Sequence, residues 1–155
     1  MIRLLALLLF LALVFQLFRF AMGLRETKRA REAKRAAEEA RGRRVVAEIP
    51  LGEGGFVLLT QDEKGFAWGS SRFARADVVG ARLLLNGGIL REFARVPGVL
   101  PPPVPPEDFE GRERWEVAVY LKDGGLARIP CGTLREGVSR EIASQVYAAV
   151  ERASA

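Results

Sequence analysis

The feature that most constrains this chain is an almost uninterrupted apolar run at its N-terminus. Residues 4–18 carry no charged side chain, and beyond Arg19 the apolar residues continue to Leu24. A helix of about 21 residues rises about 31 Å, which matches the hydrocarbon thickness of a bilayer. If Arg19 reaches back to one interface, the sequence predicts a transmembrane signal-anchor helix over residues 1–24.

Positive charge follows the apolar run directly and predicts the orientation of this helix. Residues 25–35 contain six Lys or Arg and two Glu. Because dense positive charge resists translocation, we expect a single-pass protein of the bacterial inner (plasma) membrane, with the N-terminus outside and the C-terminal domain in the cytoplasm. The basic residues nearest the bilayer are expected to contact anionic lipid headgroups. These candidate membrane-contact residues are Arg19, Arg25, Lys28, Arg29 and Arg31.

A cleavable signal peptide is the main alternative for the same run. Arg3, the apolar stretch and the Ala-Met-Gly of residues 21–23 mimic the three regions of such a peptide. Cleavage would leave a periplasmic ligand-binding or lipid-binding domain that starts near Leu24. The sequence does not decide whether residues 1–23 are removed.

Residues 25–42 favour a basic helical stalk. The segment is rich in Ala, Arg, Lys and Glu and contains no proline, and Gly42 is the first glycine in it. Four alanines recur at three-four spacing, so a homodimer through this helix stays open as an alternative. A solvated single helix is favoured, because alanine side chains bury little area. These alanines are Ala30, Ala33, Ala37 and Ala40.

The distribution of charge argues against a nucleic-acid partner. The whole chain has a formal net charge of +5, but residues 1–44 hold 11 Lys or Arg against 4 acids. The remainder of the chain is therefore slightly acidic, whereas a phosphate backbone binds basic surfaces. We expect no nucleic acid to bind.

The residue types needed for catalysis or metal binding are scarce. The chain has no histidine and one cysteine, Cys131, which excludes Ser-His and Cys-His pairs and Cys/His zinc clusters. The glycine-rich residues 52–55 lack the Gly-Lys-Ser/Thr of a phosphate-binding loop. Asp62, Glu63 and Asp77 fall in expected turns or strand edges, where acids are ordinarily solvated. We expect no enzyme, no catalytic residue, no metal and no cofactor.

After Gly42 the hydrophobic period changes from helical to alternating, which predicts a β-rich domain over residues 43–155. Glycine-containing turns at residues 86–88 and 123–125 predict two hairpins. About seven strands are expected, at residues 44–50, 55–60, 66–68, 77–85, 89–96, 115–122 and 126–129.

The chain is expected to end in an amphipathic helix, which makes the fold class α+β. Thr133 and Glu136 stand at the spacing of a capping box. An apolar stripe follows at helical spacing and is expected to cover one sheet. Its residues are Val138, Ile142, Val146, Ala149 and Val150.

Short antiparallel strands in one meander, a final hairpin WEVAVYLKDGGLARIP and one closing helix resemble the bacterial pleckstrin-homology-like domains of small membrane proteins. The passage FARADVVGARLLLNGG, in which Asp77 precedes a strand that enters a turn, is similar to the usual pattern of this family. The resemblance covers residues 43–153 and implies an antiparallel β-roll or barrel capped by a helix, used for binding and without catalytic residues. Two departures, a proline-rich loop at residues 97–113 and no evident Lys/Arg pocket between the first strands, argue against phosphoinositide binding.

The proline-rich loop is the first place to look for recognition, together with an exposed strand edge. Its prolines favour an extended polyproline conformation, which suits either an aromatic groove of a partner or a stiff connector between strands. The sequence therefore predicts a membrane-anchored, non-catalytic interaction module at the cytoplasmic face that binds a protein partner of unknown identity. The candidate recognition residues are Pro101, Pro102, Pro103 and Phe109.

Overall fold

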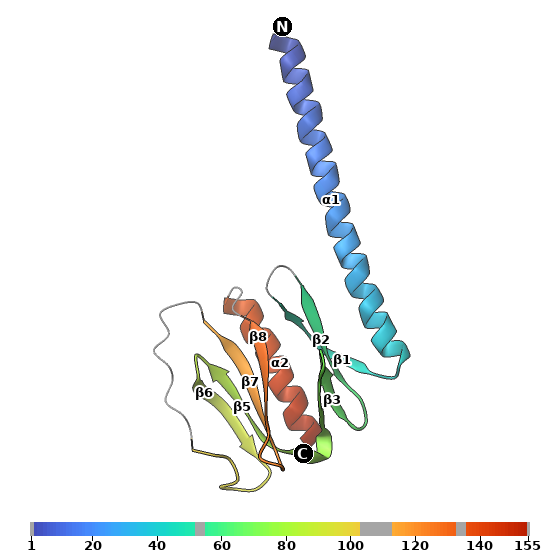
Figure 1. Ribbon diagram of the computed structural model, residues 1–155. Coiled ribbons are helices and arrows are strands. Elements are labelled where there is room, and N and C mark those ends of the chain that lie inside the picture. Colours follow the sequence, from blue (N-terminus) through green and yellow to red (C-terminus); the bar gives the residue numbers. More distant parts are fainter. Residues whose placement is uncertain (1, 52–54, 103–112, 133–135, 155) are drawn as a thin grey trace. The chain divides into compact units, whose positions relative to one another are not determined.

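The computed structural model describes residues 2–51, 55–102, 113–132 and 136–154 (Figure 1). The chain divides into two compact units, Met1–Arg41 and Gly42–Ala155, and each is described by itself. Gly42 has a φ of 74°, the left-handed conformation in which a helix commonly ends and which glycine adopts without strain.

The first unit is a single helix, α1 (Ile2–Ala40). Two ion pairs lie along the helix and at its end: Lys28–Glu32, with Nζ and Oε1 3.8 Å apart, and Arg41–Glu38, with Nη1 and Oε1 2.7 Å apart. Such pairs contribute only tenths of a kcal/mol each. The predicted continuity between the apolar run and the basic stalk is confirmed, because one helix contains both.

The predicted transmembrane segment is wrong, and so are the single-pass topology and the inner-membrane location. Of the helices in the described part of the chain, none is long and apolar enough to cross a membrane. The prediction depended on extending the apolar run past Arg19. In α1 the uncharged run extends over residues 4–18 and ends at Arg19. As a helix this run rises only about 22 Å, less than the roughly 30 Å of a hydrocarbon core.

The second unit begins with an antiparallel sheet in the order β1-β2-β3-β4. Strand β3 places Phe66 opposite Phe73 of β4, with stacked rings whose centroids lie 5.3 Å apart. Gly65 allows β3 and β4 to approach closely, because a Cβ there would lie 2.2 Å from the carbonyl oxygen of Phe73. The sequence did not predict β4, since Phe73 is its only large apolar residue. The strands are β1 (Arg44–Pro50), β2 (Phe56–Gln61), β3 (Gly65–Trp68) and β4 (Ser71–Ala74).

The second antiparallel sheet has the order β6-β5-β7-β8. Its predicted hairpin turn is confirmed, because Asn86 and Gly87 have φ values of 51° and 82°. Asn86 also fixes the start of β7: Arg114 N donates to Asn86 Oδ1 over 2.7 Å, and Asn86 N donates to Arg114 O over 2.9 Å. The strands are β5 (Val78–Leu85), β6 (Gly88–Ala94), β7 (Trp115–Leu121) and β8 (Leu126–Gly132), and the 3-10 helix η2 (Arg75–Asp77) precedes β5.

The predicted single barrel of about seven strands is wrong, because the eight strands of the described residues form two four-stranded sheets. Strand β5 pairs with β6 on one edge and β7 on the other, so neither edge is open to β4. The first sheet therefore ends at β4, although β4 directly precedes β5 in the chain. The unit is α+β, with two antiparallel sheets and a C-terminal helix. The resemblance to pleckstrin-homology-like domains stays a prediction.

The C-terminal helix α2 (Glu136–Ser154) packs between the two sheets (Figure 1) and contacts β1, β5, β7 and β8. Val138, expected in its apolar stripe, is 54% exposed, and the neighbouring Ser139 is buried instead. Thr133 of the expected capping box lies outside the described residues. The buried face of α2 consists of Ser139, Ala143, Val146, Tyr147, Ala149, Val150, Ala153 and Ser154.

Candidate functional site

A groove of about 870 Å³ lies between strand β1 and helix α2. We call it the arginine groove. Its lining extends along α2 from Glu141 to Ala153, which corresponds to about 18 Å of helix. The principal lining residues are Arg44, Val45 and Val46 of β1, Gln61 of β2, Arg75 of η2, Arg91 of β6, and Glu141, Ser144, Gln145, Ala148, Glu151 and Arg152 of α2.

A β-bulge gives the groove its apolar part. On a regular strand Val45 and Val46 would point to opposite faces of the sheet. The register between β1 and β2 shifts between Val45 and Ala47, and both valines line the groove. Bulges commonly re-aim a side chain in this way. Together with Ala148 and Ala149 of α2, the valines provide small apolar contacts between the charged groups.

The groove contains more positive than negative charge, with four arginines and two glutamates in its lining. Arg91 is engaged within the protein: its Nη2 lies 3.7 Å from Glu151 Oε2, and its guanidinium lies 4.9 Å from the ring centroid of Tyr147. Arg44 and Arg75 are exposed, and neither pairs with a carboxylate among the residues that the structure describes. Two guanidinium groups are therefore available to a ligand.

A second cavity, of about 200 Å³, lies on the opposite face of the β6-β5-β7-β8 sheet from the core. Arg82 of β5 lines it and is only 5% exposed. Its Nε pairs with Glu92, its Nη1 donates to Tyr120 Oη over 3.1 Å, and its Nη2 donates to Pro101 O over 2.6 Å. Arg82 therefore attaches the start of the proline-rich loop to the sheet.

The structure divides the predicted recognition residues. Pro101 and Pro102 are exposed and line the second cavity, whereas Pro103 and Phe109 lie outside the described residues. Sequence reasoning missed Arg82, because a charged residue in a strand is ordinarily taken to face solvent. The available signal was its position inside the otherwise apolar strand Val78–Leu85.

The predicted membrane-contact residues all lie on α1 and are exposed, as is each alanine of the stripe proposed for dimerisation. Their contact with anionic headgroups or with a second copy stays a prediction. The membrane-contact residues are Arg19, Arg25, Lys28, Arg29 and Arg31.

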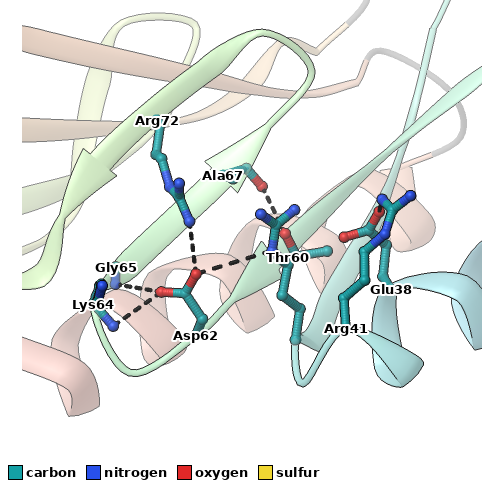
Figure 2. A network of polar contacts seen from close by, with 9 residues as sticks. Glu38, Arg41, Thr60, Asp62, Lys64, Gly65, Ala67 and Arg72 are labelled. Atoms are coloured by element: carbon teal, nitrogen blue, oxygen red, sulfur yellow. Dashed lines mark hydrogen bonds and ion pairs between the residues drawn. The ribbon is translucent and has the colours of Figure 1, made fainter.

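Asp62, considered above as a catalytic carboxylate, holds a turn (Figure 2). Its Oδ1 accepts hydrogen bonds from Gly65 N over 2.8 Å and from Lys64 N over 2.9 Å, and its Oδ2 accepts one from Arg72 Nη2 over 2.8 Å. Arg43 Nε lies 3.9 Å from the same Oδ2. The hydrogen bond from Gly65 is the largest cause that lowers the pKa of Asp62 below its ordinary value. The carboxylate thus has a structural role.

This lowered pKa predicts a pH-dependent contribution to stability. Because the unfolded chain takes up the proton first as the pH falls, the contribution of Asp62 is complete above about pH 5 and declines as the pH falls through the folded-state pKa. We expect Asp62→Asn, which keeps the Oδ1 acceptor but not the charge, to cost about 1 kcal/mol at pH 7 and much less at pH 3. Urea denaturation at both pH values measures this difference. An equal cost at both values would contradict the role of the charge.

Cys131 is fully buried, and burial, followed by the nearby Glu116, raises the pKa of its thiol to about 12. The thiol is therefore protonated at neutral pH and does not supply a nucleophile. Within the ranges that the structure describes, no cluster of three Cys, Asp or Glu residues could hold a metal ion.

The two cavities differ in their suitability for a ligand. Arg82 in the smaller cavity has its donors occupied by Glu92, Tyr120 and Pro101. Arg44 and Arg75 in the arginine groove form no ion pair with a carboxylate among the described residues. No protein family, curated protein or solved structure that was compared with this chain matches it, so the assignment of a function rests on the geometry of the arginine groove.

Proposed function

We propose that the second unit is a non-catalytic protein-binding module, and that the arginine groove binds an acidic segment of a partner protein. The observation that carries the proposal is the pair Arg44 and Arg75, which have no carboxylate partner in the described part of the chain. Arginines that line a concave surface attract carboxylates and hydrogen-bond them in a planar, two-pronged geometry. Their charge also steers an acidic partner toward the site.

The dimensions of the groove support a segment of polypeptide as the ligand. An extended chain rises about 3.3 Å per residue, so the roughly 18 Å of α2 between Glu141 and Ala153 accommodates about five residues. Its lining combines arginines with the small apolar side chains of Val45, Val46 and Ala148. This combination suits a segment in which acidic and apolar side chains are mixed.

The two glutamates of the lining favour discrete acidic side chains over a nucleic-acid backbone. Glu141 and Glu151 lie in the same groove as the four arginines. A phosphate backbone presents charge continuously and gains from a surface of one sign. A peptide carries carboxylates only at certain positions, so Glu141 and Glu151 can lie beside uncharged positions of the peptide.

The test is photo-cross-linking from inside the groove. A photoreactive amino acid replaces Gln145, which is exposed and lines the groove, in the full chain expressed in its host. The matched control carries it at Arg140, which is exposed on the same helix but does not line the groove. We expect a cross-linked protein from position 145 only, and an acidic cross-linked peptide when the product is sequenced by mass spectrometry.

A charge reversal then tests the electrostatic part. We expect Arg44→Glu to lower the cross-linking yield from position 145 at least about tenfold, a difference of about 1.4 kcal/mol in binding free energy. Arg140→Glu changes the net charge equally and is expected to leave the yield within about twofold. Equal yields from positions 145 and 140, or a cross-linked peptide without acidic residues, would count against the groove as the binding site.

A further inference from the structure

Strand β1 is an edge strand. It pairs with β2, and no second strand pairs with it in the described part of the chain. Apart from that ladder, no main-chain hydrogen bond between described residues involves Arg44, Val45 or Val46. An edge strand directs half of its N–H and C=O groups away from its one neighbour, and such groups are a template for a further strand.

Only the first half of this edge is open. Pro50 has no N–H to donate, and it lies against Gly132 of β8, where an added Cβ would be 3.1 Å from Pro50 Cγ. The other half, Arg44–Val46, lines the arginine groove opposite α2. Figure 1 shows α2 lying between the sheet that contains β1 and the sheet that contains β8. Arg44–Val46, whose outer main-chain edge pairs with no described strand, and the two arginines without a described carboxylate partner therefore belong to the same groove.

We infer that the partner segment binds as an added β-strand along the edge of β1 at Arg44–Val46, with acidic side chains at alternate positions; this inference rests on the function proposed above. In an extended strand, alternate side chains point the same way, so every second residue faces the same wall of the groove. Carboxylates on one set of positions reach Arg44 and Arg75, and small apolar side chains on the other set meet Val45, Val46 and Ala148. Main-chain hydrogen bonds supply affinity, and the alternate side chains supply specificity.

The probe is a fluorescent seven-residue peptide of alternating Glu and Val with blocked ends, titrated with the full chain and followed by anisotropy. Two further peptides are methylated on the amide nitrogens of the Glu residues only or of the Val residues only. In a strand these two sets of amides point to opposite edges, so only one set faces β1. We expect one methylated peptide to bind at least about tenfold more weakly than the parent, and the other to bind within about threefold of it.

The outcomes separate the binding mode from the proposed function. If both methylated peptides bind equally well or equally badly, strand addition is overturned, while a tenfold weakening by Arg44→Glu but not by Arg140→Glu would still support the groove. Parent binding that is insensitive to Arg44→Glu counts against the proposed function as well. If the parent peptide shows no saturable binding, strand addition is overturned, because that binding mode requires only a main chain and alternating carboxylates, and the peptide has both. The cross-linking result then decides the proposed function.

Discussion

Replacing Tyr147 with alanine is expected to lower the free energy of unfolding of the second unit by about 3–5 kcal/mol. Tyr147 is 1% exposed and belongs to the core between α2 and the two sheets. Its ring meets the ring of Phe93 of β6 edge to face, with centroids 5.8 Å apart. Truncation removes this packing and leaves a cavity that neighbouring side chains fill only in part. Urea denaturation followed by tryptophan fluorescence measures the loss, because Trp115 is buried in the same core.

The variant Tyr147→Phe separates the ring from the hydroxyl. The hydroxyl donates only a long hydrogen bond, 3.4 Å, to Glu151 Oε1. Burial, followed by the charge of Glu151, raises the pKa of Tyr147 to about 12, so the hydroxyl stays protonated near neutral pH. We therefore expect Tyr147→Phe to cost less than about 1 kcal/mol. If the two variants were equally destabilised, the hydroxyl and not the ring would be the source of stability.

Local patterns predicted the elements of the second unit better than their arrangement. The strand predicted from residue 115 and the turn at Asn86-Gly87 are local features, and both appear in the structure where they were expected. The alternation had predicted one buried face for this strand, but β7 is buried on both faces from Trp115 to Val119. The order β6-β5-β7-β8 depends on pairing between distant residues. Strands adjacent in sequence pair about two thirds of the time, so a meander was the reasonable expectation. In a meander β7 would pair with β6, but in the structure it pairs with β5 instead.

The buried face of helix α2 was predicted correctly at Val146, Ala149 and Val150, but not at its start. Its apolar stripe was predicted to start at Val138, but the buried face includes the neighbouring Ser139. Tyr147, buried at the centre of that face, was absent from the predicted stripe. The helical period locates the centre of a buried face, but the breadth of that face and its first turn depend on packing against β1 and β5.

The arginine groove could not be predicted, because its residues are distant in the sequence. Arg44, Arg75, Arg91 and Arg152 come from four different elements, and only folding brings them to one groove. The bulge next to Val45 and Val46, which both line the groove, leaves no mark in a hydrophobic pattern. The sequence predicted an exposed strand edge without naming the strand, and the structure shows that β1 is an edge strand.

Replacing Arg82 with methionine is expected to lower the free energy of unfolding by about 2–3 kcal/mol. Methionine keeps an unbranched apolar side chain of similar length but removes all three hydrogen bonds, to Glu92, Tyr120 and Pro101. Hydrogen bonds of a charged donor contribute about 1.5–3 kcal/mol each, but relief of the desolvation of the buried guanidinium offsets part of the loss. The side chain of Glu92 is 43% exposed, so water solvates its carboxylate once Arg82 is gone.

The same substitution is expected to release the start of the proline-rich loop. Arg82 Nη2 donates to Pro101 O, and Leu100 packs near Gly80, where an added Cβ would lie 2.9 Å from Leu100 Cδ2. Amide hydrogen exchange at Val99 and Leu100 should therefore accelerate in Arg82→Met by more than the change in global stability accounts for. Glu92→Gln is the matched control: it removes only the half-exposed charge, and we expect it to cost less than about 1 kcal/mol and to leave this exchange unchanged.

Arg82→Lys completes the series, because lysine keeps the charge but lacks the planar fork that reaches three acceptors. We expect it to lie between Glu92→Gln and Arg82→Met in stability, and to accelerate exchange at Val99 and Leu100 if it fails to reach Pro101 O. A neutral or stabilising effect of Arg82→Met would mean that desolvation of the guanidinium outweighs its three hydrogen bonds, as is known for other buried ion pairs. Unchanged exchange at Leu100 in that variant would mean that packing alone, without Arg82, holds the loop on the sheet.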